Sequence, residues 1–140
     1  MVMRRFTLPL FAALSLALTG GAAWSADKYA AIAYSRATGV NNVAYNHPSR
    51  TAAEHTVLDI CRRQASDCTA PVWVQNGCVA LAVGVANGFG TGWGATRAAA
   101  ERDAINVCRN SVKGCAIRRV ACTTSEPAAE YSSLGAQSLR

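Results

Sequence analysis

Two segments of the chain place apolar residues at the spacing of an amphipathic helix. In each segment the apolar positions follow the i, i+4, i+7, i+8 pattern that buries one stripe of a helix. The stripes consist of Ala53, Val57, Ile60 and Cys61 in the first segment, and of Ala100, Ala104, Val107 and Cys108 in the second. Ser49 and Thr96 precede the two segments as suitable N-caps. The pattern therefore predicts one helix that begins near residues 48–49 and a second that begins near Thr96.

The residues on either side of each predicted helix form short apolar stretches bounded by turn residues, which is typical of β-strands. Strands are predicted at residues 29–34, 40–45 and 71–75 around the first helix, and at residues 79–83, 89–93 and 115–121 around the second. Asn76-Gly77 is a strong hairpin pattern, so we expect the last strand of the first half to pair with the first strand of the second half. The order strand, strand, helix, strand, found twice, predicts an α+β fold with one largely antiparallel sheet and both helices on one face.

The two halves also resemble each other in sequence. A shift of 47 residues superposes the first two cysteines of each half, and over residues 49–68 seven of twenty positions are identical. We interpret residues 29–77 and 78–122 as an internal duplication within a single domain that spans residues 26–122.

The two ends of the chain differ in composition from this domain. Two adjacent arginines, an apolar stretch at residues 6–18 and small residues at 20–23 form the three parts of a secretory signal peptide. The apolar stretch is shorter than the about 20 residues that a membrane-spanning helix needs. We place cleavage after Ser25, with cleavage after Ala23 as the alternative. The result would be a periplasmic or secreted protein with no membrane span, ending in a flexible tail at residues 123–140.

The charge of the chain argues against one class of partner. There are 14 Lys and Arg against 8 Asp and Glu, so loss of Arg4 and Arg5 with the signal peptide leaves 12 basic side chains and a net charge of +4. The basic residues are spread along the chain instead of gathering on one face, so we expect no nucleic-acid partner. Attraction to an anionic polymer of the cell surface stays open.

All six cysteines lie in the part that remains after cleavage. An even number of cysteines in a small exported chain predicts disulfide bonds, because the compartment outside the inner membrane is oxidising. If a pseudo-twofold axis relates the two halves, the pairs are Cys61 with Cys68, Cys108 with Cys115, and Cys78 with Cys122. The cysteines are spaced too widely for a structural zinc site, so we expect no metal.

Four short segments together match the pattern of a known family. They lie at residues 29–35 (YAAIAYS), 45–54 (YN, then PSRTAAE), 78–84 (CVALAVG) and 92–101 (GWGATRAAAE). In combination they resemble the bacterial secreted family called domain of unknown function 4189, over about residues 29–122. The resemblance implies a small exported domain with disulfide bonds, and it carries over no catalytic residue.

The glycine-rich segment at residues 90–95 superficially fits the dinucleotide fingerprint G-x-G-x-x-[GA]. The acidic residue that this fingerprint requires about 20 positions later is absent, so we expect no cofactor. The alternation of side chains between the two faces of a strand explains these glycines better, since the predicted strand places on one face Gly88, Gly90, Gly92 and Gly94. Such a face allows a helix or a ligand to approach closely.

Candidates for catalysis are few. His47 and His55 are the only histidines, and His55 with Asp59 is the one pair spaced to orient an imidazole on a helix. This pair defines the alternative function, a small secreted hydrolase that uses His55 with Asp59 or His47. The chain has no G-x-S-x-G element and no free cysteine is expected, so we expect that it is not an enzyme.

The interpretation that we favour is a non-catalytic protein of the envelope that binds or inhibits a partner. The partner would be cell-wall glycan such as peptidoglycan, or a secreted or periplasmic protein. A rigid sheet stapled by disulfides loses little entropy on binding. The expected binding surface consists of Trp73, Trp93, Arg118 and Arg119. A purely structural role stays open, as does the oligomeric state.

Overall fold

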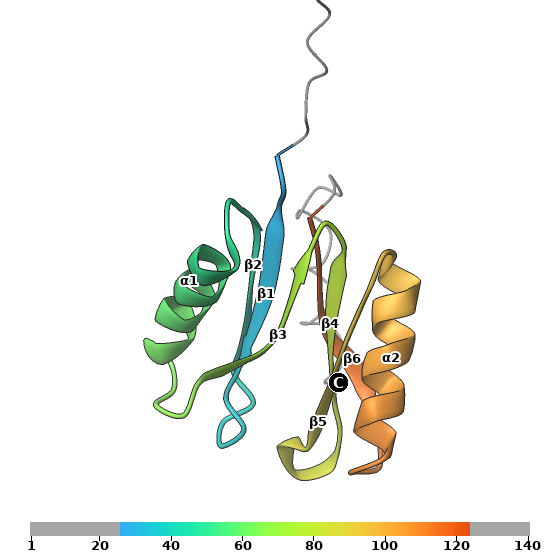
Figure 1. Cartoon of the computed structure of the whole chain (residues 1–140). Helices are drawn as coiled ribbons and strands as arrows, with labels where there is room; N and C mark the ends of the chain where they lie inside the picture. Colours follow the sequence, from blue (N-terminus) through green and yellow to red (C-terminus); the bar gives the residue numbers. More distant parts are fainter. Residues whose placement is uncertain (1–25, 124–140) are drawn as a thin grey trace, which may run out of the picture.

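The computed structural model describes residues 26–123 of the 140-residue chain (Figure 1). The predicted signal peptide, residues 1–25, lies outside the described residues, as does the predicted tail apart from Thr123. The elements are, in chain order, β1 (Tyr29–Tyr34), β2 (Asn41–His47), α1 (Arg50–Arg62), β3 (Thr69–Gln75), β4 (Cys78–Val83), the 3-10 helix η1 (Val85–Asn87), β5 (Phe89–Gly94), α2 (Arg97–Arg109) and β6 (Ala116–Cys122).

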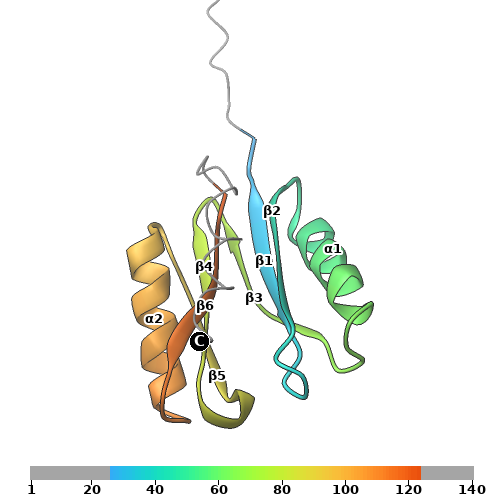
Figure 2. The ribbon, with the colours of Figure 1, turned by 180° about the vertical axis from the view of Figure 1, so that it is seen from behind.

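The strands form two antiparallel sheets of three strands each. The first sheet has the order β2-β1-β3 and the second has the order β5-β4-β6. Helix α1 packs on the first sheet and α2 on the second, so the layers are helix, sheet, sheet, helix (Figures 1 and 2). Between the sheets β1 contacts β4, β2 contacts β6, and β3 contacts β5. The predicted α+β class with antiparallel strands is confirmed.

The prediction of one sheet with both helices on one face is wrong, and the burial of the central strands explains why. Residues 30–34 of β1 and all of β4 are buried, so both faces of each strand are covered. One face packs on a helix, as Ala31 does in a cluster with Val57. The other face packs between the sheets, where Ile32 and Leu81 share one core. A single sheet with helices on one face would leave this second set of apolar side chains in water.

The expected hairpin between β3 and β4 is also wrong. β3 pairs with β1, and β4 pairs with β5 and β6, so the chain crosses from one sheet to the other at Asn76 and Gly77. Asn76 has a φ of 50°, and its side chain holds the start of the domain. Its Oδ1 accepts from the Lys28 N–H at 3.0 Å, and its Nδ2 donates to Asp27 Oδ1 at 2.7 Å. A connection between two sheets can need a residue with positive φ, just as a hairpin turn does, so Asn76-Gly77 is compatible with either connection.

Both helices begin at the predicted residues. The hydroxyls of Ser49 and Thr96 accept hydrogen bonds from the backbone N–H three residues later, at 3.1 and 3.2 Å. One position in each predicted stripe is wrong, because Ile60 and Val107 are 37% and 42% exposed. Each helix rests on its sheet through a narrow i, i+4, i+8 row, which leaves the i+7 position at the margin of the contact.

Helix α2 lies directly against the glycine face of β5. A Cβ atom added at Gly90 or Gly92 would collide with backbone atoms of α2, and one added at Gly94 would lie 2.7 Å from the Ala99 Cβ. The predicted close approach on this face is therefore made by a helix. It brings Asp103 and Val107 of α2 next to the edge of the second sheet.

Three disulfide bonds staple the described residues in the pairing that the sequence predicts. They join Cys61 to Cys68, Cys108 to Cys115, and Cys78 to Cys122. The first two each connect the end of a helix to the start of the next strand, whereas the third joins β4 to β6 within the second sheet. Thr123, which the sequence assigns to the tail, is buried, and its N–H donates to the Gly77 carbonyl at 2.9 Å.

Candidate functional site

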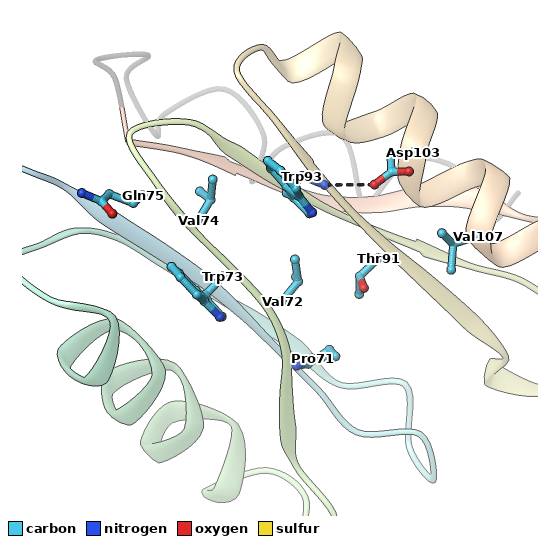
Figure 3. A pocket seen from close by; sticks show the side chains of 9 residues that line it. All are labelled: Pro71, Val72, Trp73, Val74, Gln75, Thr91, Trp93, Asp103 and Val107. Atoms are coloured by element: carbon cyan, nitrogen blue, oxygen red, sulfur yellow. Dashed lines mark hydrogen bonds between the residues drawn. The ribbon is translucent and has the colours of Figure 1, made fainter.

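A groove opens at the side of the sandwich where β3 and β5 form the edges of the two sheets (Figure 3). Its volume is about 730 Å³, which is in the range of small-molecule sites. Most of the lining side chains are apolar, and three polar ones lie among them. The lining residues are Pro71, Val72, Trp73, Val74, Gln75, Thr91, Trp93, Asp103 and Val107.

Trp93 forms the wall of the groove on the second sheet. It stands opposite Val79 of β4, so the two side chains lie on the same face, toward the first sheet. Val79 is fully buried, whereas Trp93 is 65% exposed because β5 is an edge strand. The Asp103 carboxylate accepts a hydrogen bond from the Trp93 backbone N–H at 3.4 Å (Figure 3), which links this strand edge to α2.

Trp73 lines the groove from the first sheet, with its side chain on the face of β3 that α1 covers, whereas its neighbours Val72 and Val74 face the second sheet. It stands opposite Ala31, whose side chain packs in the cluster under α1. The guanidinium carbon of Arg50 lies 4.4 Å from the centroid of the Trp73 ring, and Arg50 Nε donates to Glu54 Oε1 at 2.9 Å. The Tyr29 ring centroid lies 6.3 Å from that of Trp73. These contacts orient the indole while leaving 36% of the residue exposed.

The two strand edges that frame the groove are both protected against the addition of another strand. Pro71 on β3 has no N–H to donate to an incoming chain. On β5 the Trp93 N–H already donates to the Asp103 carboxylate. At these two positions neither edge offers a free backbone N–H to an added strand, which disfavours a continuous ladder of backbone hydrogen bonds.

The structure separates Arg118 and Arg119 from the two tryptophans. Both arginines lie on β6, the edge strand on the other side of the second sheet from β5. Arg119 Nε donates to Asn41 Oδ1 at 2.5 Å, which joins β6 to β2 across the two sheets. Arg118 is the extra residue where the pairing of β4 with β6 shifts register. The four residues expected to form one surface thus lie on two sides, and only the tryptophans line the groove.

The residues proposed for hydrolysis lie outside the groove, on α1 and at the end of β2. Asp59 pairs with Arg63 through a contact of 2.6 Å between Oδ2 and Nη2, and both Asp59 and His55 are exposed on α1. His47 ends β2, opposite Tyr29 in the pairing with β1. Neither histidine lines the groove. Within residues 26–123, no group of three or more His, Cys, Asp or Glu side chains is placed to hold a metal ion.

A polar cluster outside the groove, which the sequence did not indicate, holds the loop after β1. The buried Ser35 hydroxyl donates to one oxygen of Asp67, and the Ala37 N–H donates to the other at 2.8 Å. These hydrogen bonds hold the pKa of Asp67 below its usual range. Next to it the Tyr34 hydroxyl donates to the Asn87 carbonyl at 2.9 Å, and burial raises the pKa of Tyr34. Only the fold brings together partners so far apart in sequence.

The fold and the groove define a small α+β domain that is stapled by disulfides and carries a groove along the edges of β3 and β5. Residues 29–122 match the family described as a domain of unknown function (DUF4189), and the chain belongs to this family. The NMR structure of Rv1813c from Mycobacterium tuberculosis is similar, with a TM-score of 0.52 and 27% identity over 87% of this chain and 98% of that chain. Comparison with curated proteins gives no match. Among the described residues, no helix has the length and apolar character to span a membrane.

Proposed function

We propose that this protein is a non-catalytic binding module of the bacterial envelope, and that it holds a segment of cell-wall glycan in the groove that Trp73 and Trp93 line. One observation carries the proposal. Two tryptophans from edge strands of different sheets line the same groove, where one of them is 65% exposed although the core between the sheets begins beside it. A contiguous apolar surface of this kind is typical of a binding site, because covering it with a ligand removes apolar area from water.

The lining of the groove suits a saccharide. Sugar rings present flat C–H faces that pack on indole rings, and their hydroxyl groups need hydrogen-bond partners at the margins. Gln75, Thr91 and Asp103 supply both donors and acceptors among the apolar lining residues. The protected strand edges disfavour the main rival in such a position, which is an extended peptide that adds to a sheet.

The rigidity of the scaffold supports a binding role. The three disulfide bonds staple both halves of the domain, and Trp73 is oriented by its contacts with Arg50 and Tyr29. A site that is ordered before the ligand arrives loses less conformational entropy on binding than a mobile one. A shallow groove with walls fixed in this way can therefore hold a polar ligand such as a glycan.

The test is a titration of the oxidised chain from Ala26 to Arg140 with soluble glycan strands released from peptidoglycan. This chain contains every helix, strand and disulfide that the structure describes. Trp73 and Trp93 are its only tryptophans, so the change in tryptophan fluorescence reports on the groove alone. We expect saturable binding that Trp93→Ala weakens by about fivefold, since loss of one aromatic contact removes on the order of 1 kcal/mol.

Tyr45→Ala is the matched control. Tyr45 is 38% exposed on β2, an edge strand on the other side of the first sheet from β3, so its removal should leave the affinity unchanged. Calorimetry gives the affinity of each variant independently of fluorescence. Equal weakening by Tyr45→Ala and Trp93→Ala, or no binding of glycan strands at all, would contradict the proposal, and the search would then turn to a secreted protein as the partner.

A further inference from the structure

Arg50 is placed to add selectivity to the groove. Its guanidinium carbon lies 4.4 Å from the Trp73 ring centroid, so a positive charge lies next to the groove, on the α1 side of Trp73. The side chain is 53% exposed, and its ion pair with Glu54 uses Nε. A guanidinium has five N–H donors in a planar fork, and the two terminal nitrogens carry four of them. Arg50 thus stays able to bind an anion after pairing with Glu54.

The charged groups near the groove differ between its two sides. Asp103 is the one carboxylate among the lining residues, and it lies on the side of Trp93. Arg50 lies on the side of Trp73. Asp103 repels a ligand carboxylate from the Trp93 side and suits hydroxyl or amide N–H groups. On the Trp73 side Glu54 offsets the charge of Arg50, and a ligand carboxylate can accept hydrogen bonds from the terminal nitrogens of the guanidinium.

From this charge arrangement we infer that the groove selects an acidic saccharide, a sugar chain that bears a carboxylate, and that Arg50 binds the carboxylate while Trp73 packs on the sugar ring. The inference rests on the proposed glycan-binding function and names its ligand class. A carboxylate on a sugar chain can come from a lactyl substituent, as in muramic acid, or from the ring itself, as in a uronic acid. The guanidinium fork recognises the carboxylate in both cases.

Three oligosaccharides of equal length separate these possibilities by calorimetry at low salt. One is neutral and built of N-acetylglucosamine, one carries muramic acid carboxylates, and one is an oligouronate. For the unaltered chain we expect an acidic ligand to bind about tenfold more tightly than the neutral one, and we expect this preference to shrink as salt is raised. Preference for the muramic acid ligand alone, or for both acidic ligands, supports the inference and identifies the source of the carboxylate.

The variant Arg50→Gln tests the role of the charge. It should weaken the acidic ligands by about tenfold more than the neutral ligand, which loses only what Arg50 contributes by orienting the Trp73 ring. Arg63→Gln is the matched control, because it removes a second i,i+4 ion pair from the same helix without touching Trp73. An exposed ion pair contributes about 0.5 kcal/mol or less to stability, so both variants should fold, which circular dichroism can verify.

Two outcomes overturn the inference while leaving the proposed function intact. In the first, the unaltered chain binds neutral and acidic ligands equally. In the second, Arg50→Gln weakens both classes of ligand by the same factor, which would mean that Arg50 only orients the Trp73 ring. Failure of all three ligands to bind would instead contradict the proposed glycan-binding function itself, so the two failures are distinguishable.

Discussion

The contact between α2 and β5 makes a quantitative prediction for Gly92→Ala. An added Cβ would collide with the carbonyl oxygen of Ala100 and the backbone nitrogen of Ala104, and backbone atoms cannot rotate away as a side chain can. Helix α2 would have to move away from the sheet, and overpacking of this kind costs about 1 to 3 kcal/mol. Because two backbone atoms are involved, we expect a loss of about 3 kcal/mol, offset by about 0.4 to 1 kcal/mol from the less flexible unfolded chain.

The expected net loss for Gly92→Ala is therefore about 2 kcal/mol, which in a domain of this size lowers the melting temperature by about 8 to 16 °C. The assay is urea unfolding of the oxidised chain, followed by circular dichroism. Gly94→Ala is the graded control, since its Cβ would lie 2.7 Å from the side chain of Ala99 and no closer to the α2 backbone than 3.2 Å. It should be milder by about 1 kcal/mol. A Gly92→Ala variant within 0.5 kcal/mol of the parent, or more stable than Gly94→Ala, would refute the described packing.

Two further predictions concern the disulfides and the polar cluster. Replacing Cys78 and Cys122 by Ala should lower the free energy of unfolding by about 4 kcal/mol, and replacing Cys61 and Cys68 by about 2.5 kcal/mol. The bridges span 44 and 7 residues, and the entropy that the unfolded chain gains on losing a bridge grows with the length of the closed loop. Equal losses in urea unfolding would contradict this order. Since the pKa of Asp67 is lower in the folded state, its contribution to stability is complete well above about pH 4 and is lost as pH falls through the folded pKa. Asp67→Asn should reduce the fall in the urea midpoint between pH 6 and pH 2, and an unchanged fall would assign the acid sensitivity to other groups.

Local features of the chain could be predicted from the sequence because they depend on short spacings. The N-caps Ser49 and Thr96 and the bridges from each helix to the next strand follow from residues at most seven positions apart. The long bridge from Cys78 to Cys122 was inferred from the pairs that remained, together with the assumed symmetry of the two halves.

The division into two sheets could not be predicted with the same certainty, because it depends on what covers each strand. Buried residues at every position of β4 fit a strand with two covered faces, yet the sequence does not say whether the second cover is a helix or a sheet. The groove was missed as a cavity for the same reason. The sequence predicts Trp73 and Trp93 on one binding surface, but only the stacking of two sheets shows that their edge strands meet at a groove. The sequence could not separate Arg118 and Arg119 from the two tryptophans, but the structure places both arginines on β6, at the opposite edge of the second sheet from β5.

The most direct test of the account is co-sedimentation of the oxidised chain from Ala26 to Arg140 with purified peptidoglycan sacculi, at low and at raised salt. The account predicts that Trp93→Ala loses most of the pelleted protein at both salt concentrations, while Tyr45→Ala pellets like the parent. If raised salt abolishes pelleting and Trp93→Ala does not change it, the result would show only adhesion of a cationic protein to an anionic wall. That result, or no pelleting at all, would contradict the claim that the groove binds cell-wall glycan.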